Sequence, residues 1–139
     1  MSIHAVLLPL IVQVALTFVL LVWTARVRIE AVRSGEVHPR DIALREPNWG
    51  TRPTQIANAY HNQLELPVLF YVLTILAIVT RQADLLFVVL AWVFVLLRLL
   101  HVFIHITSNQ VGRRFAVFAA SVVVLAVMWA IFIVRILLS

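Results

Sequence analysis

Four long apolar runs alternate with polar segments along the chain. A helix needs about 20 apolar residues to cross the hydrocarbon layer of a bilayer. The runs therefore predict four transmembrane helices, at about residues 3–26, 55–80, 84–106 and 113–138. The connections after the second and third helices are short, which makes successive helices antiparallel neighbours. The pattern predicts an all-α integral membrane protein, a four-transmembrane-helix up-down bundle that forms one domain over residues 1–139.

The first apolar run lacks a basic leading region and a small-residue cleavage site. We therefore expect it to be a membrane anchor and not a signal peptide. Residues 27–54 form the long polar stretch and contain Pro39, Pro47 and Pro53. This stretch predicts a loop, with a short interfacial helix near Ile42 to Leu44 and with Trp49 at the lipid headgroups.

The composition supports a membrane protein. Hydrophobic residues make up 63% of the chain and charged residues 12%, and the mean hydropathy is +1.04. A soluble domain is about half apolar and about a quarter charged. The chain has no cysteine, which excludes disulfides, thiolate metal ligands and cysteine nucleophiles.

The basic excess is best explained by membrane topology. A pI of about 11.4 would suggest nucleic-acid binding in a soluble protein, but we expect no nucleic-acid partner here. Arginines concentrate near the loops that follow the first and third helices, at Arg26, Arg28, Arg33, Arg40, Arg45, Arg52, Arg113 and Arg114. The opposite side has Arg81 and Arg135. By the positive-inside rule, loop 27–54 is cytoplasmic and both termini lie outside, in the inner membrane if the source is bacterial.

Polar residues form a stripe on the second predicted helix. Asn58, His61 or Asn62, and Glu65 recur at i, i+3 or i+4, and i+7, which places them on one helical face. Ionisable residues inside a membrane segment are costly, so they are candidates for function.

The third predicted helix carries a matching stripe of Arg98, His101 and His105. At about 1.5 Å of rise per residue, Glu65 and Arg98 lie roughly 15 Å and 12 Å below the cytoplasmic ends of their helices. Either charge alone in hydrocarbon is costly. We therefore predict a buried Glu65–Arg98 ion pair, which could serve only to hold the two helices in register.

Above this pair we expect a cationic, hydrogen-bonding mouth that opens to the cytosol. It combines both stripes with the first residues of the fourth helix and comprises Asn58, His61, Asn62, His101, His105, Arg113 and Arg114. Free N–H groups at a helix start add affinity for anions. The mouth suits a small polar anion beside a lipid-exposed cleft. His101 and His105 could chelate a metal, but no third ligand is spaced to join them. Haem binding, with His61 and either of these histidines as axial ligands, is a further alternative.

The segment Ala59-x-x-Asn62-x-x-Glu65, followed by Pro67 and then Leu69-Phe70, resembles the helix-two signature of the MAPEG superfamily, the membrane-associated proteins in eicosanoid and glutathione metabolism. The superfamily includes microsomal glutathione transferases, microsomal prostaglandin E synthase, leukotriene C synthase and the non-enzymatic lipoxygenase-activating protein. Length, four spans, the first loop and the helix-three arginine extend the resemblance over nearly the whole chain.

The resemblance implies a homotrimer with glutathione bound between neighbouring subunits near the cytosolic face. It implies that Asn62 and Glu65 contact glutathione and that Arg98 and His101 stand at the family's helix-three polar positions. Arg114 falls on the arginine that stabilises the glutathione thiolate in the enzymes, with Arg113 as the alternative if the register shifts by one. A guanidinium near sulfur favours the reactive anion.

Four residues depart from the family's pattern. Asn58 stands where enzymes of the family commonly have an arginine, and His61 where some have another; these arginines grip the carboxylates of glutathione. His105 stands where a tyrosine is usual, and Phe118 where prostaglandin synthase and its relatives carry another tyrosine. Two functions therefore remain: a glutathione-dependent transferase or peroxidase acting on lipophilic small molecules, and a non-catalytic lipid-binding or scaffold protein. A transporter would show broken helices or paired repeats, and the sequence predicts neither.

Overall fold

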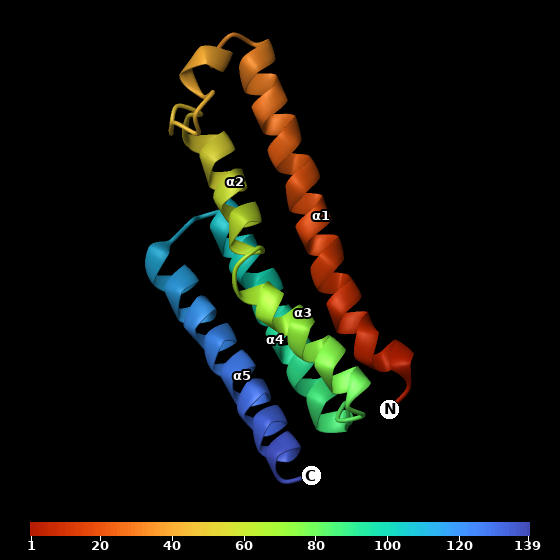
Figure 1. Cartoon of the computed structure of the whole chain (residues 1–139). Helices are drawn as coiled ribbons and strands as arrows, with labels where there is room; N and C mark the ends of the chain where they lie inside the picture. Colours follow the sequence, from red (N-terminus) through yellow and green to blue (C-terminus); the bar gives the residue numbers. More distant parts are fainter.

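The computed structural model describes all residues from Met1 to Ser139. It is all-helical, and its antiparallel helices form an elongated bundle with both chain termini at the same end (Figure 1). In chain order the elements are α1 (Ile3–Arg33), the 3₁₀ turn η1 (Pro39–Asp41), α2 (Thr51–Asn62), α3 (Leu66–Val79), α4 (Leu85–Ile106) and α5 (Val111–Leu137).

Four helical segments are long and apolar enough to cross a membrane, with α2 and α3 together forming the second of them. The predicted four-helix membrane bundle is thus confirmed as the fold. α1 continues to Arg33, beyond the predicted end at residue 26, because no proline or glycine occurs between residue 26 and Gly35. Gly35 has a φ of +82° and ends the helix, as glycine does after many helices. The short helix expected near Ile42 to Leu44 is instead the preceding turn at Pro39–Asp41.

The second predicted helix is broken, and the prediction of one continuous helix over residues 55–80 is wrong. α2 ends at Asn62 and α3 begins at Leu66, with Pro67 as its second residue. Proline has no N–H to donate to the carbonyl four residues earlier, and it is well accommodated in the first turn of a new helix. One break without a paired repeat does not reproduce the internal symmetry of transporters.

Two buried glutamines lie at this break. Gln63 Nε2 donates to Ala59 O at 3.0 Å, while the Gln63 N–H bonds to Tyr60 O and so leaves the usual helical acceptor free. Gln13 Nε2 of α1 donates to Gln63 Oε1 at 2.9 Å, and both side chains are fully buried. The Gln63 side chain thus replaces a helical bond that the break removes, and Gln13 ties the break to α1.

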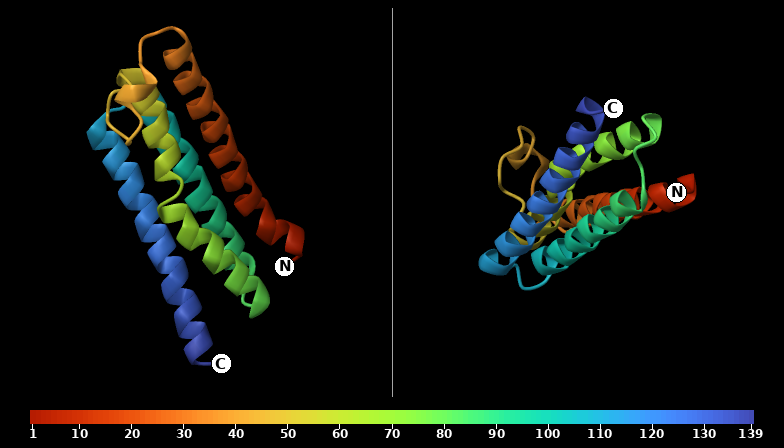
Figure 2. Two further views of the ribbon diagram at one scale, coloured as in Figure 1. Left: turned by 45° about the horizontal axis from the view of Figure 1, so that its top comes forward. Right: turned by 90° about the horizontal axis from the view of Figure 1, so that it is seen from below.

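The core lies mainly toward the end of the bundle that carries the termini. Its buried residues come from α1, α3, α4 and α5, and Phe70 stacks on Phe94 with ring centroids 4.8 Å apart. α4 packs against α1, α2 and α5, and Figure 2 shows it running alongside these helices over much of the length of the bundle. Hydrophobic side chains also cover much of the outer surface, as expected for helices that face lipid.

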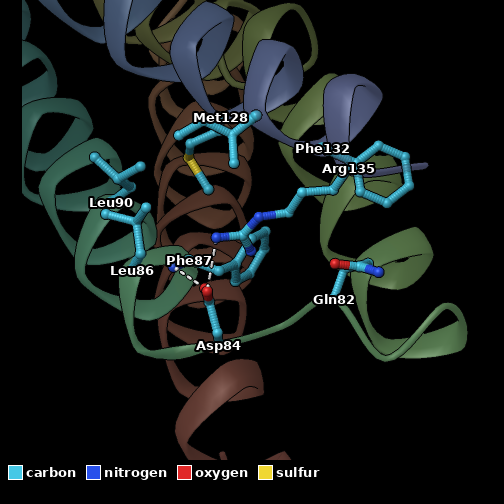
Figure 3. A pocket seen from close by; sticks show the side chains of 9 residues that line it. Gln82, Asp84, Leu86, Phe87, Leu90, Met128, Phe132 and Arg135 are labelled. Atoms are coloured by element: carbon cyan, nitrogen blue, oxygen red, sulfur yellow. Dashed lines mark hydrogen bonds and ion pairs between the residues drawn. The ribbon is translucent and has the colours of Figure 1, made fainter. Parts of the chain in front are cut away.

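Asp84 links two helices at the end of the bundle that carries the termini (Figure 3). Its Oδ1 accepts the Phe87 N–H at 2.9 Å and caps the start of α4, and its Oδ2 lies 2.8 Å from Arg135 Nη2 near the end of α5. The hydrogen bond from Arg135 holds the pKa of the Asp84 carboxyl below its usual range. A carboxyl with a lowered folded-state pKa stabilises the fold above its ordinary pKa, and that contribution is lost as the pH falls through the lowered value.

We expect Asp84→Asn to cost less than about 1 kcal/mol at neutral pH, because it removes a half-exposed ion pair and keeps a capping oxygen. Asp84→Ala removes the cap as well and should cost about 1 kcal/mol more. Both losses should shrink in acid below the lowered pKa. Thermal unfolding in detergent at neutral and acidic pH measures this, with Asp41→Asn at an exposed pair as control. Equal losses of stability in Asp84→Ala and Asp41→Asn would contradict this prediction.

Candidate functional site

Arg98 is a fully buried charge in the middle of the bundle. Its Nη2 donates to Asn62 Oδ1 at the end of α2, while its Nε and Nη1 are buried without a protein partner. A buried arginine is costly unless hydrogen bonds satisfy its donors. The Arg98 side chain therefore keeps two buried donor atoms that the single chain does not satisfy.

The predicted Glu65–Arg98 ion pair is wrong for the single chain. The two ion pairs that form are Arg40–Asp41 and Arg135–Asp84, and Glu65 is exposed. The physical reason is the break after α2. Glu65 has a φ of −98° and a ψ of −99°, outside the helical region, so it leaves the stripe that a continuous helix would form. Asn62, the last residue before the break, occupies the place beside Arg98.

A cavity of about 220 Å³ opens next to Asn62 and Arg98, near the α4–α5 turn. Side chains from α2, α4 and α5 line it: Asn62, His101, Val111, Arg114, Phe115 and Phe118. The rings of His101 and Phe118 have centroids 5.9 Å apart, and Arg98 Cζ also lies 5.9 Å from the Phe118 ring. The cavity thus combines an amide, an imidazole and a guanidinium with an aromatic wall.

Arg114 reaches this cavity from the first turn of α5, and its position is set by the preceding turn. Its Nη1 donates to Asn109 Oδ1 at 2.5 Å, and Asn109 has a φ of +50°, which asparagine tolerates better than most residues. Asn109 was not among the predicted site residues, although an asparagine just before a helix start is a recognisable turn signal. Free N–H groups at the start of α5 add to the anion preference of the cavity.

The end of α4 that carries the histidines is held by α2. Arg52 Nη1 donates to Ile106 O at 2.6 Å, and Gln55 Nε2 donates to His105 O at 2.7 Å. These bonds satisfy carbonyls that have no partner within a helix, and the Arg52 cation also complements the negative end of the α4 dipole. α2 thus fixes the last turn of α4 directly beside the cavity.

The structure brings only some of the predicted site residues together. Asn62, His101 and Arg114 line the cavity and Arg98 lies behind it, while His105 is buried one turn beyond His101, with ring centroids 5.7 Å apart. Arg113 is exposed and does not line the cavity, whereas Arg114 does. Three others are exposed and lie outside the cavity: Asn58, His61 and Glu65.

The chemistry of the cavity favours an anion. Arg98 and Arg114 supply two guanidinium groups beside it, and the Nδ1 atoms of His101 and His105 are buried without partners. No group of three or more metal-ligating side chains occurs in the chain. A volume of about 220 Å³ is below the roughly 300–1,000 Å³ of typical ligand pockets. A single chain therefore encloses only part of a site for a ligand of ordinary size.

Fold and site define an integral membrane four-helix bundle with a buried arginine and a cationic cavity near one end. The family model described as MAPEG family matches residues 6–134, so the chain belongs to the MAPEG family. This confirms the membership that the helix-two signature predicted, and it associates the chain with membrane proteins of eicosanoid and glutathione metabolism. Comparisons with curated proteins and with solved structures found no match.

Proposed function

We propose that this protein is a glutathione-dependent membrane enzyme of the microsomal glutathione transferase type. The observation that carries the proposal is the meeting of Arg114 with Asn62 and His101 around one cavity, with the free donors of Arg98 behind it. These side chains come from three different helices. Glutathione is an anionic tripeptide, and charge-assisted hydrogen bonds from guanidinium groups are the strongest that a protein can offer it.

In this mechanism Arg114 stabilises the thiolate of glutathione, because a cation beside sulfur favours the deprotonated, nucleophilic form. For conjugation, the thiolate forms a carbon–sulfur bond with an electrophilic lipid while the leaving group departs with its electron pair. For peroxide reduction, sulfur attacks the O–O bond and releases a lipid alcohol and a sulfenic acid. A second glutathione then converts the sulfenic acid to glutathione disulfide and water.

A homotrimer would complete the site. The exposed polar residues Asn58, His61 and Glu65 belong to the membrane-spanning segment formed by α2 and α3, where contact with lipid is unfavourable. A neighbouring subunit that covers this face would shield them and enlarge the cavity. In the proposed orientation the α4–α5 turn and residues 34–50 face the cytoplasm, where glutathione is available, and both termini lie outside.

A non-catalytic lipid-binding or scaffold role is the second candidate. It is favoured by the neutral amide of Asn58, which stands where enzymes of the family commonly carry arginine, and by the imidazole of His61, which stands where some of them carry another. Neutral hydrogen bonds are weaker than bonds from a charged group by roughly a factor of two. In this role the polar residues would serve only to hold the helices and subunits together.

Titration of the detergent-purified protein with glutathione, followed by thermal unfolding, tests the proposal. A ligand that binds only the folded state adds about 2.7 kcal/mol of stability at a hundred times its dissociation constant. S-methylglutathione keeps the carboxylates but cannot form a thiolate, so it should stabilise the protein less. An unchanged unfolding temperature at millimolar glutathione would reject the enzyme and favour the scaffold.

A further inference from the structure

A pocket of about 250 Å³ lies between the first turn of α1 and the last turn of α3, at the end of the bundle that carries the termini (Figure 1). We call it the terminal pocket, and its lining includes Ile3, Val6, Ala77, Ile78 and Arg81. It shares no lining residue with the cavity near the α4–α5 turn at the opposite end of the bundle. An inference about the terminal pocket is therefore independent of the proposed glutathione site.

The walls of the terminal pocket are apolar. Ile3 and Val6 come from α1, and Ala77 and Ile78 come from α3. Val6 and Ala77 belong to the buried core, whereas Ile3 is 55% exposed. Ile3 and Val6 are about one helical turn apart, so the wall extends about 4.5 Å along the axis of α1. The pocket thus has an apolar floor at the core and is open toward the surrounding lipid.

One charged side chain, that of Arg81, lines the terminal pocket. Arg81 is exposed and takes part in neither of the two ion pairs of the chain. Its φ is +58°, and the Gln82 N–H closes the end of α3 by bonding to Ala77 O at 2.8 Å. Glycine is the usual residue at such a position after a helix. The turn itself therefore does not require arginine, and the guanidinium is available to a ligand.

No carboxylate compensates the charge of Arg81. Asp84 is the only acidic residue at this end of the bundle, and its carboxyl pairs with Arg135 at 2.8 Å (Figure 3). No acidic residue lines the terminal pocket. A free guanidinium at the edge of a membrane span, next to an apolar wall, matches a lipid that carries an anionic phosphate above an acyl chain.

We propose that the terminal pocket binds phosphatidylglycerol from the leaflet at this end of the bundle. The Arg81 guanidinium donates to the lipid phosphate, and an acyl chain lies along Ile3 and Ile78. The lack of a free carboxylate selects this headgroup. Phosphatidylethanolamine and phosphatidylcholine would each bring a second cation close to Arg81, where like charges repel and no carboxylate is free to pair with the ammonium.

The full chain is reconstituted into nanodiscs of phosphatidylcholine mixed with equal amounts of phosphatidylglycerol and phosphatidylethanolamine, and then transferred to detergent. Native mass spectrometry measures the lipid that stays bound. We expect phosphatidylglycerol to be retained over both other lipids. Arg81→Gln should lower that preference on the order of tenfold, the effect of losing one charge-assisted hydrogen bond. Arg33→Gln is the matched control, because Arg33 is exposed in the last turn of α1, at the opposite end of the bundle.

Arg81→Gly separates the loss of charge from a loss of folding. Glycine adopts the positive φ of this position readily, so the variant should unfold at a temperature close to that of the unmodified protein. It should nevertheless lose the preference for phosphatidylglycerol as Arg81→Gln does. A preference kept in Arg81→Gly would contradict a role for the guanidinium.

Equal retention of the three lipids would overturn the proposal, as would a loss of preference in Arg33→Gln equal to that in Arg81→Gln. If a second copy of the chain covers the terminal pocket instead, Arg81→Gly will change the oligomeric state in size-exclusion chromatography and leave the lipid preference unaltered, which also overturns the proposal. Glutathione binding by Arg81→Gly is expected to equal that of the unmodified protein, so this test and the test of the enzyme fail separately.

Discussion

Arg114→Ala is expected to remove most of the stabilisation that glutathione confers on this protein. Arg114 lines the cavity and is held toward it by Asn109. Hydrogen bonds to charged groups are worth about 1.5–3 kcal/mol, so the dissociation constant should rise by roughly 10- to 100-fold. At a concentration that adds about 2.7 kcal/mol to the unmodified protein, the variant should gain only about 0.4–1.4 kcal/mol.

Arg113→Ala is the matched control for this experiment. Arg113 precedes Arg114 in the same turn of α5, but it is exposed and does not line the cavity. The control loses the same charge and should bind glutathione as the unmodified protein does. Comparable losses in both variants would show a general electrostatic effect and remove Arg114 from the site. A loss in Arg113→Ala alone would assign the thiolate role to Arg113.

Asn62→Leu should be the most destabilising of the single substitutions considered for this protein. Asn62 Oδ1 accepts the one side-chain hydrogen bond that Arg98 makes, and Arg98 is fully buried. Removing the partner of a buried charge typically costs about 3–5 kcal/mol. Arg98→Met should cost less, because it removes the charge itself and leaves only a neutral amide unpaired, at about 1–3 kcal/mol.

A double-mutant cycle isolates the interaction. Asn62→Leu combined with Arg98→Met should be more stable than the sum of the single losses predicts, by about 0.5–3 kcal/mol. Urea unfolding or thermal unfolding in detergent gives the required free energies. Glu65→Gln is the comparison variant and should change the stability of the single chain by less than about 0.5 kcal/mol, since Glu65 is exposed there and forms no ion pair with Arg98. A loss of stability in Glu65→Gln as large as that in Asn62→Leu would mean that the Glu65 carboxylate pairs with Arg98.

The sequence by itself determined the class of protein, the number of spans and the family. Four apolar runs are local features, and hydrocarbon leaves the backbone no stable alternative to a helix once such a run enters the membrane. The spacing of Arg98, His101 and His105 also predicted one buried face of α4, because helical periodicity depends only on position along the chain. The cavity residues Asn62, His101 and Arg114 were all among the predicted site residues.

Only the tertiary structure decided which of these residues meet. The break between Asn62 and Leu66 moves Glu65 out of the polar stripe of the second predicted helix. Asn62 is instead the residue that accepts the hydrogen bond of Arg98. The Asn109 bond positions Arg114, and residues of α2 hold the end of α4. Such pairings depend on backbone bends and on contacts between residues distant in sequence. Side-chain direction follows the local helix axis, so a single unforeseen break was enough to change the partner of a buried charge.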